Sequence, residues 1–160
     1  MNDRNGPPQA DPLMLRLLEP RVERPIQEVS RSSVHPGHRG VLASLEFGTL
    51  PFVPLRLFSV SQVRGDNPRG GHGHRQTIQL LLCEAGSILV RWDDCVETSG
   101  SMLLTPQGPG LLIQPLVWAT QTYTAPDSLL VVLASHAYDA EDYLTADEIR
   151  KLRLSADPVR

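Results

Sequence analysis

Short apolar runs separated by turn residues make up most of the chain from Val34 onward. Several runs alternate apolar and polar positions, as residues 87–92 do, which is the period of a strand with one buried face. The Gly, Pro, Asp and Asn residues between them recur at the spacing typical of antiparallel sandwiches and barrels. The pattern predicts an all-β domain with strands over 41–47, 52–63, 77–83, 87–92, 102–104, 111–117, 120–124 and 128–134.

The two ends of the chain have a different texture. Residues 1–33 are rich in Pro, Arg, Glu and Ser without sustained periodicity, which predicts a flexible or partner-packed N-terminal arm. Thr145 is followed three residues later by Glu148, the spacing of an N-terminal capping box, so a short helix should start there. The predicted organisation is an arm over 1–33, one domain over 34–144, and a helix and tail over 145–160.

Composition narrows the class of protein. The 160 residues are 41% hydrophobic and 21% charged, as expected of one globular domain. The net charge of −3 argues against general affinity for nucleic acid or for an anionic membrane. We find neither an apolar run long enough to cross a membrane nor a signal peptide, so the cytoplasm is the expected location. Cys83 and Cys95 are then expected to be reduced thiols.

The segment with the clearest chemistry is Arg69-Gly-Gly-His-Gly-His-Arg75, at the lip of a predicted strand. Because side chains two apart on a strand share a face, His72 and His74 should point the same way. Gln79 and Gly86 follow at fixed distances. This spacing resembles the first cupin motif, with Gln79 where the metal-binding cupins carry Glu.

The region of a second cupin motif, residues 110–120, argues against a metal ion. It supplies a glycine, an apolar run and Pro115, but Ala119 and Thr120 occupy the positions where a ligand histidine would fall. Two imidazoles and one amide are too few ligands for a functional metal site. The sequence therefore predicts no metal, and it leaves both histidines for acid–base chemistry, which suits a side chain with a pKa of about 6.5.

A wider set of residues resembles one family, the cupin-type dTDP-sugar 3,4-ketoisomerases. The resemblance runs from about 39 to 144 and is carried, in order, by Arg39-Gly40, Glu46, Leu50-Pro51-Phe52, Arg56, the 69–75 block, 79–83, Gly86-Ser87, 110–113, Trp118, 127–135, Tyr138-Asp139 and Asp142-Tyr143. It implies a cupin jelly roll (a double-stranded β-helix) with a short C-terminal helix. It also implies a metal-independent homodimer without a cofactor, which converts a nucleotide-linked 4-keto-6-deoxyhexose to its 3-keto isomer.

The implied reaction suggests a role for each candidate residue. Moving a ketone from C4 to C3 requires removal of a proton from C3, an enediolate, and return of a proton to C4, which two histidines can perform without a cofactor. By resemblance His72 is the base, and His74 is its partner in a relay or in stabilising the enediolate. The guanidinium of Arg56 would suit the diphosphate or the developing oxyanion. The predicted substrate-binding set is completed by Arg69, Ser59, Gln79 and Trp118, although core packing is an alternative for Trp118.

This chain also departs from the family. Serines stand at positions 59 and 61, where the family usually carries tyrosines, and Ala119 replaces the histidine that commonly follows the tryptophan. Three alternatives therefore stay open: a cupin that binds a sugar nucleotide without turnover, an epimerase acting on a related keto sugar, and a metal-dependent cupin oxygenase. The acidic residues Asp139, Glu141 and Asp142 are predicted to form a solvated turn before the helix.

Overall fold

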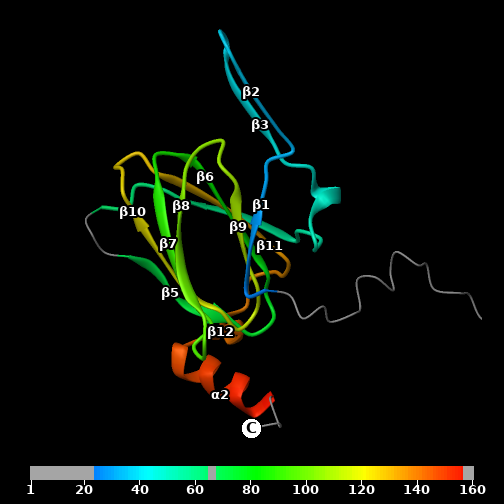
Figure 1. Cartoon of the computed structure of the whole chain (residues 1–160), viewed down its shortest axis with the longest axis vertical. Helices are drawn as coiled ribbons and strands as arrows, with labels where there is room; N and C mark the ends of the chain where they lie inside the picture. The colour runs from blue at the N-terminus through cyan, green and yellow to red at the C-terminus, as the bar shows by residue number, and fades with distance from the viewer. Residues whose placement is uncertain (1–23, 65–67, 157–160) are drawn as a thin grey trace, which may run out of the picture.

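Two five-stranded antiparallel sheets face each other in the computed structural model, which describes residues 24–64 and 68–156 (Figure 1). The first sheet has the order β1 (Ile26–Val29), β9 (Gly110–Ile113), β6 (Gln79–Ala85), β11 (Leu129–Ala134) and β4 (Arg56–Val60). The second has the order β12 (Tyr143–Leu144), β5 (Arg69–His74), β10 (Trp118–Tyr123), β7 (Ile88–Asp93) and β8 (Ser99–Leu104). The prediction of an all-β sandwich is confirmed.

The apolar residues of the strands form two clusters. The first lies between the sheets and includes Leu81, Ile88 and Leu111. The second lies on the outer face of the first sheet, where Phe52 packs with Leu80, Leu82, Leu112 and Leu133. Strand β6 is therefore buried on both faces, which explains why its sequence is continuously apolar instead of alternating. Replacing Leu81 by Ala should cost about 2–5 kcal/mol of stability, because it would open a cavity in the core.

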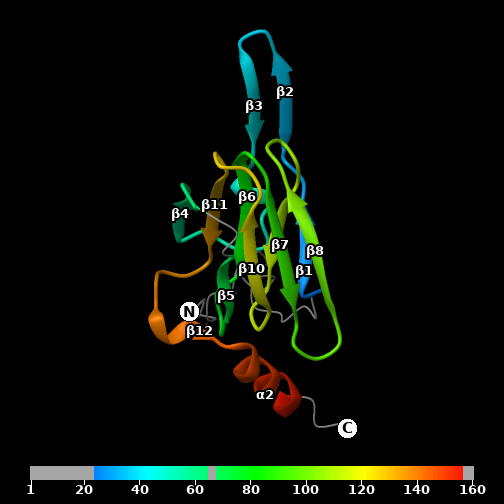
Figure 2. The same cartoon turned by 90° about the vertical axis from the view of Figure 1, so that its left-hand side faces the viewer.

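A separate hairpin extends from the sandwich. Strands β2 (Ser33–Gly37) and β3 (Gly40–Ser44) pair only with each other, and the hairpin projects beyond the two sheets (Figure 2). A short 3-10 helix, η1 (Phe47–Thr49), follows it. The chain before the hairpin is fastened to the sandwich by Arg31, whose guanidinium lies 2.7 Å from a carboxylate oxygen of Glu84. The ion pair therefore holds in place the segment from which the hairpin extends.

The ends of the chain partly follow the prediction. Residues 26–29 form a strand of the first sheet, so the domain starts before the predicted boundary at residue 34, while residues 1–23 of the predicted arm lie outside the described residues. The predicted helix is present as α2 (Ala146–Ala156). Its capping box is formed, since the Thr145 backbone N–H donates to Glu148 at 2.8 Å and the Glu148 N–H donates to Thr145 Oγ1 at 3.3 Å.

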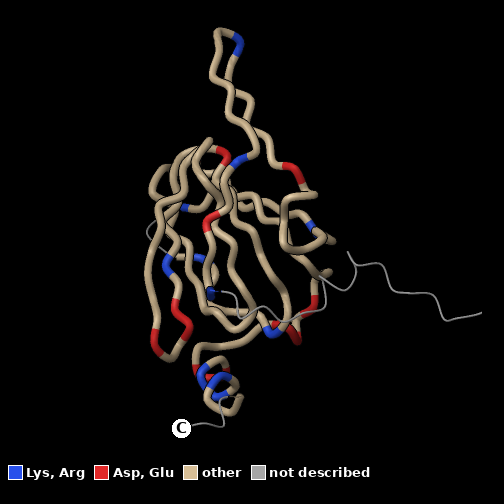
Figure 3. Tube along the Cα trace, turned by 45° about the vertical axis from the view of Figure 1, so that its right-hand side comes forward, with Lys and Arg blue, Asp and Glu red and all other residues tan. Residues whose placement is uncertain are grey.

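The charged residues of α2 are separated by sign along the helix, with Asp147 and Glu148 in the first turn and Arg153 in the last turn. Figure 3 shows both kinds of charge on α2, and acidic positions at the turn between β7 and β8. Of the helices in the described part of the chain, none has the length and apolar character needed to cross a bilayer.

Candidate active site

One row of cross-strand partners runs across the whole first sheet. It consists of Ile26, Ile113, Gln79, Ala134 and Arg56, each directly opposite the next. Residues directly opposite each other in antiparallel strands share a face. Because Ile113 belongs to the core between the sheets, Gln79 and Arg56 also face the second sheet.

A matching row crosses the second sheet. It consists of His72, Ala119, Trp92 and Gly100. Ala119 belongs to the same core, so His72 faces the first sheet. His74 lies two residues further along β5 and pairs with Tyr143 of β12. The two histidines of one sheet therefore face Gln79 and Arg56 of the other.

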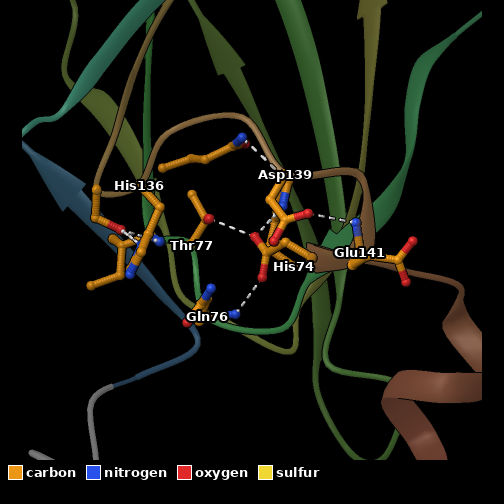
Figure 4. A network of polar contacts seen from close by, with 10 residues as sticks. His74, Gln76, Thr77, His136, Asp139 and Glu141 are labelled. Atoms are coloured by element: carbon orange, nitrogen blue, oxygen red, sulfur yellow. Dashed lines mark hydrogen bonds and ion pairs between the residues drawn. The ribbon is translucent and has the colours of Figure 1, made fainter.

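His74 is held on both sides of its ring. Its Nδ1 lies 3.0 Å from Oδ2 of Asp142, and its Nε2 lies 3.1 Å from the amide nitrogen of Gln79. Asp142 also accepts hydrogen bonds from the Gln76 backbone N–H and the Thr77 hydroxyl; Figure 4 shows this network around the imidazole. The Gln79 amide donates to Nε2, so the proton of the neutral ring sits on Nδ1 and points at the carboxylate. Both nitrogens of His74 are thus engaged.

The electrostatics of this pair favour a neutral imidazole beside an ionised carboxylate. Burial lowers the pKa of His74 and the neighbouring His72 lowers it further, while Asp142 opposes the shift. Burial alone would raise the pKa of Asp142, but hydrogen bonds from Thr77 and Gln76 and the neighbouring His74 outweigh it, so the pKa is lowered. The network therefore fixes both the charge and the orientation of His74.

His72 has more freedom than His74. Its ring centroid lies 5.2 Å from that of His74 and 4.5 Å from that of Tyr143. Burial lowers its pKa, and a hydrogen bond with the backbone of Gly70 acts in the opposite direction. Among the described residues no side chain forms a hydrogen bond with this ring. His72 can therefore present a neutral nitrogen lone pair to a bound molecule.

Arg56 supplies a positive charge at the edge of the group. Its guanidinium carbon lies 4.4 Å from the ring centroid of Phe58 and 5.2 Å from that of Tyr138. No carboxylate within 24–64 or 68–156 forms an ion pair with it. Its charge contributes to the lowered pKa of His74, which places it near the imidazole. A cation held by aromatic faces and lacking a carboxylate partner can accept an anionic ligand.

Three of the predicted substrate-binding residues lie apart from this group. Ser59 is exposed on the outer face of β4, because it pairs with Val131, which packs against the outer apolar cluster. Trp118 precedes Ala119 on β10 and therefore points to the other face of the second sheet. Arg69 is exposed at the start of β5 and pairs with Gln121, away from the His74 network. The structure brings together His72, His74, Gln79 and Arg56.

Sequence analysis did not identify Asp142 as a partner of His74. The prediction of a solvated turn is wrong for this residue, which is only 4% exposed. The Asp139 side chain accepts the Glu141 backbone N–H and caps a short 3-10 helix, η2 (Ala140–Asp142), which turns Asp142 inward. Tyr143, whose ring centroid is also 4.8 Å from that of His74, was missed in the same way.

Metal-ligating side chains do not gather in the described part of the chain. Over residues 24–64 and 68–156, no three His, Cys, Asp or Glu side chains are grouped so that they could hold a metal ion.

Comparisons with known proteins identify relatives of the chain. The family model described as "FdtA: WxcM-like, C-terminal" matches residues 27–150. The TDP-4-oxo-6-deoxy-alpha-D-glucose-3,4-oxoisomerase of Aneurinibacillus thermoaerophilus is 35% identical over 107 residues, which is 66% of this chain and 76% of the relative.

Solved structures agree with these relatives. A histidine-to-asparagine variant of the 3,4-ketoisomerase QdtA from Thermoanaerobacterium thermosaccharolyticum, in complex with TDP-4-keto-6-deoxyglucose, superposes with a TM-score of 0.76 at 25% identity, over 87% of this chain and 100% of that chain. The WlaRB TDP-quinovose 3,4-ketoisomerase from Campylobacter jejuni gives 0.71 at 26% identity, over 79% and 97%. The rmlC epimerase of Mycobacterium tuberculosis, at 17% identity with a TM-score of 0.66 over 76% and 68%, shares the fold. With a family match over 27–150 and sugar 3,4-ketoisomerases among its relatives, the chain belongs to the FdtA, WxcM-like C-terminal family.

Proposed function

We propose that the protein is a sugar 3,4-ketoisomerase that converts a TDP-linked 4-keto-6-deoxyhexose to its 3-keto isomer without a metal ion. The observation that carries the proposal is the difference in side-chain hydrogen bonding between the two histidines. Asp142 and Gln79 occupy both nitrogens of His74, whereas His72 keeps one nitrogen that bonds no described side chain. The printed names of the relatives supply the substrate class.

The proposed reaction transfers protons and changes no oxidation state overall. His72 takes the proton from C3, the C–H electron pair becomes the C3–C4 double bond, and the C4 carbonyl oxygen becomes an oxyanion. Protonated His72 then returns a proton to C4, and the proton of the C3 hydroxyl passes to the C4 oxyanion, so that the C3 ketone and the C4 hydroxyl form together. A base with a lowered pKa is neutral at neutral pH, as the first step requires.

Arg56 is proposed to stabilise the oxyanion of the enediolate. It lies in the same cross-strand row as Gln79, separated from it by Ala134. The guanidinium packs against the rings of Phe58 and Tyr138 before a ligand binds, so little reorganisation is needed when negative charge develops.

His74 is proposed to act as the fixed partner of His72. Its ring is locked by Asp142 and Gln79, which supports a role in positioning and in stabilising the enediolate more than the first proton removal. Asp142 would then be a positioning residue, acting through His74.

The departures from the family do not remove this group. Ser59 points away from the histidines, so the absence of a tyrosine at that position leaves His72 and His74 unchanged. Tyr143 provides a phenol ring in contact with both imidazoles. Ala119 lies directly opposite His72 and belongs to the core between the sheets.

Deuterium exchange tests the proposal directly. The purified protein is incubated with TDP-4-keto-6-deoxyglucose in heavy water, and the sugar is followed by proton NMR. We expect formation of the 3-keto isomer with deuterium entering at C3 and C4. Binding of the sugar nucleotide without exchange at any carbon would instead indicate a binding protein, and inversion at another carbon would indicate an epimerase.

We further propose that the protein forms a homodimer through the projecting hairpin. An isolated two-stranded hairpin is marginally stable in water, yet β2 and β3 pair only with each other and expose Val41 and Leu42. A second apolar surface, formed by Phe47, Val53, Leu55 and Leu57 around the edge strand β4, is also exposed. A second copy of the chain would cover both surfaces.

A further inference from the structure

The base proposed above stands on an interrupted part of its strand. His72 and Gly70 pair with neighbouring residues of β10, Ala119 and Thr120, so Gly71 between them is left without a partner. Both glycines have positive φ, +80 and +77. Such a bulge breaks the regular pairing of a strand. The imidazole of His72 also forms no hydrogen bond with a described side chain, so it needs support from another element to keep one orientation.

An aromatic ring from the end of the domain supplies that support. The ring centroid of Tyr143 lies 4.5 Å from that of His72, with the ring planes tilted by 48°. It lies 4.8 Å from the centroid of His74 at 62°, and the two imidazoles are 5.2 Å apart at 88°. Aromatic rings attract each other at these separations when they are tilted or edge to face. The three rings therefore pack against one another, and Tyr143 is the nearest ring to His72.

The backbone on both sides of Tyr143 is anchored. The two residues of β12, Tyr143 and Leu144, pair with His74 and Gly73 of β5. The carbonyl of Asp142 accepts a hydrogen bond at 2.8 Å from the backbone N–H of the residue that follows His74. The flanking residues Asp142 and Leu144 are 4% and 2% exposed. The ring of Tyr143 can therefore serve as a fixed surface for the imidazole of His72.

The contact is made by the ring of Tyr143 and not by its hydroxyl. Over residues 24–64 and 68–156, no hydrogen bond joins that hydroxyl to His72 or to His74. A phenylalanine at this position would keep the contact, whereas an aliphatic side chain would not.

The same ring covers part of the imidazole. Burial is the main cause of the lowered pKa of His72, and a ring at 4.5 Å contributes to that burial. The other titratable or charged groups on this side of the site are His74 on the same strand, Asp142 in η2 and Arg56 on β4. Loss of the ring would let water reach His72, which favours the protonated form.

We propose that Tyr143 is a positioning residue for His72, whose imidazole it holds in the orientation for proton transfer and shields from water. The inference rests on the proposed function and adds a residue that acts through the base. It assigns no contact between Tyr143 and the substrate.

The first test compares the turnover of Tyr143→Leu and Tyr143→Phe in the full chain. In Tyr143→Leu, kcat and the rate of deuterium exchange should fall about tenfold or more, because the base is no longer held in place. In Tyr143→Phe both should stay within about twofold of the wild type. The KM for the TDP-sugar should be unchanged in both variants, since Tyr143 acts through His72.

The second test does not depend on turnover. The ring protons of His72, assigned with His72→Asn, are titrated by NMR in the free protein. Tyr143→Leu should raise the pKa of His72 toward its ordinary value of 6.5, and Tyr143→Phe should leave it as in the wild type. The acid limb of kcat/KM against pH should move in the same direction, to higher pH, in Tyr143→Leu alone.

Leu144→Val is the matched control. It loosens the packing of the other residue of β12, whose side chain points to the opposite face, and it leaves the three rings in place. Its melting temperature should fall, while the titration of His72 and kcat should match the wild type. If it reproduced the effects of Tyr143→Leu, loosening of the strand would explain them and the inference would be wrong.

Three other results would also overturn the inference. A loss of kcat in Tyr143→Phe equal to that in Tyr143→Leu would assign the effect to the hydroxyl. A raised KM with unchanged kcat would indicate a contact with the substrate. An unchanged titration of His72 in Tyr143→Leu would show that the ring does not shield it. If the wild type neither isomerises the sugar nor exchanges deuterium, the proposed function fails, and the NMR titration alone decides whether Tyr143 holds and shields His72.

Discussion

The carboxylate of Asp142 lies 3.0 Å from Nδ1 of His74, although 68 positions separate the two residues in the chain. The carboxylate also accepts two hydrogen bonds from residues 76 and 77, so the loop that carries Asp142 is tied to the end of β5. The orientation of His74 therefore depends on the far end of the chain, and several measurements can test what this arrangement does.

Replacing Asp142 by Asn should weaken both the fold and the site. The amide cannot accept all the hydrogen bonds that the carboxylate accepts, so we expect a loss of about 1–3 kcal/mol in the free energy of unfolding. Deuterium exchange should slow while the Kd for TDP stays near the wild-type value, because Asp142 acts through His74. Thermal unfolding measures the change in stability, NMR measures deuterium exchange, and calorimetry measures the Kd for TDP. Glu141→Gln changes an exposed neighbour in the same way and should behave as wild type; equal effects from both variants would contradict a specific role for Asp142.

Replacing His72 by Asn should abolish most of the chemistry and keep the fold. The rates of isomerisation and of deuterium uptake should fall by about a hundredfold or more, the usual contribution of a positioned general base. Affinity for TDP should be retained, since the sugar end alone is affected. His74→Asn should slow exchange less and lower the melting temperature more, because its ring is part of a buried network. The opposite order of the two exchange rates would reassign the base.

The pH dependence of exchange follows from the lowered pKa of His72. Its ordinary value is 6.5, and burial moves it down, so the ring stays neutral to a lower pH than a free imidazole does. Protonation removes the lone pair, so activity should be full at neutral pH and should be lost as the pH falls to values below 6.5. The acid limb of kcat/KM against pH measures this value. Because the two imidazoles are neighbours, the measured pKa belongs to the pair, and a limb above pH 7 would rule out the proposed protonation state.

Replacing Arg56 by Lys should weaken binding of the substrate about tenfold and slow exchange. An ammonium cannot reproduce the planar guanidinium held against Phe58 and Tyr138. The Kd for the TDP-sugar and the exchange rate give the two readings. Arg91→Lys, an exposed position on β7, is the matched control. Unchanged binding and exchange in Arg56→Lys would show that the guanidinium has no contact with the ligand.

The assembly state can be tested by light scattering. The wild type should be a dimer at micromolar concentration, and replacing both Val41 and Leu42 by Asp should give a monomer, because charges would replace the apolar face of the hairpin. Leu154→Asp on α2 is a control with a similarly exposed leucine, 55% against 58% for Leu42. A monomeric wild type would refute the proposed dimer.

The sequence predicted most of the strands because alternation and turn residues are local signals. It also placed His72 and His74 on one face, which strand geometry confirms. The same geometry would have separated Ser59 from Arg56, since residues three apart on a strand face opposite ways, and would have turned Trp118 away from Ala119. Ser59 and Trp118 were predicted to bind substrate from the family resemblance, and that prediction did not take the alternation of side chains into account.

The remaining differences have non-local causes. Asp142 sits in an acidic segment that looks solvated, and its burial depends on pairing with β5 many residues earlier. Likewise, Ile26–Val29 forms a strand because it pairs with β9 at the edge of the first sheet, and not because its own sequence is strongly apolar. Such pairings between distant segments leave no local periodicity to detect.

The row of five partners across the first sheet has a consequence for how this protein can vary. Side chains alternate between the two faces of a strand. Gln79 and Arg56 face the histidines only because each stands at an inward-facing position of its strand. Substitutions along the row can alter substrate preference one position at a time while the fold persists. An insertion or deletion of a single residue within β4 or β6 would instead move every side chain beyond it to the opposite face of the sheet. Divergence at this site should therefore proceed by replacement of residues, with changes of length confined to the turns.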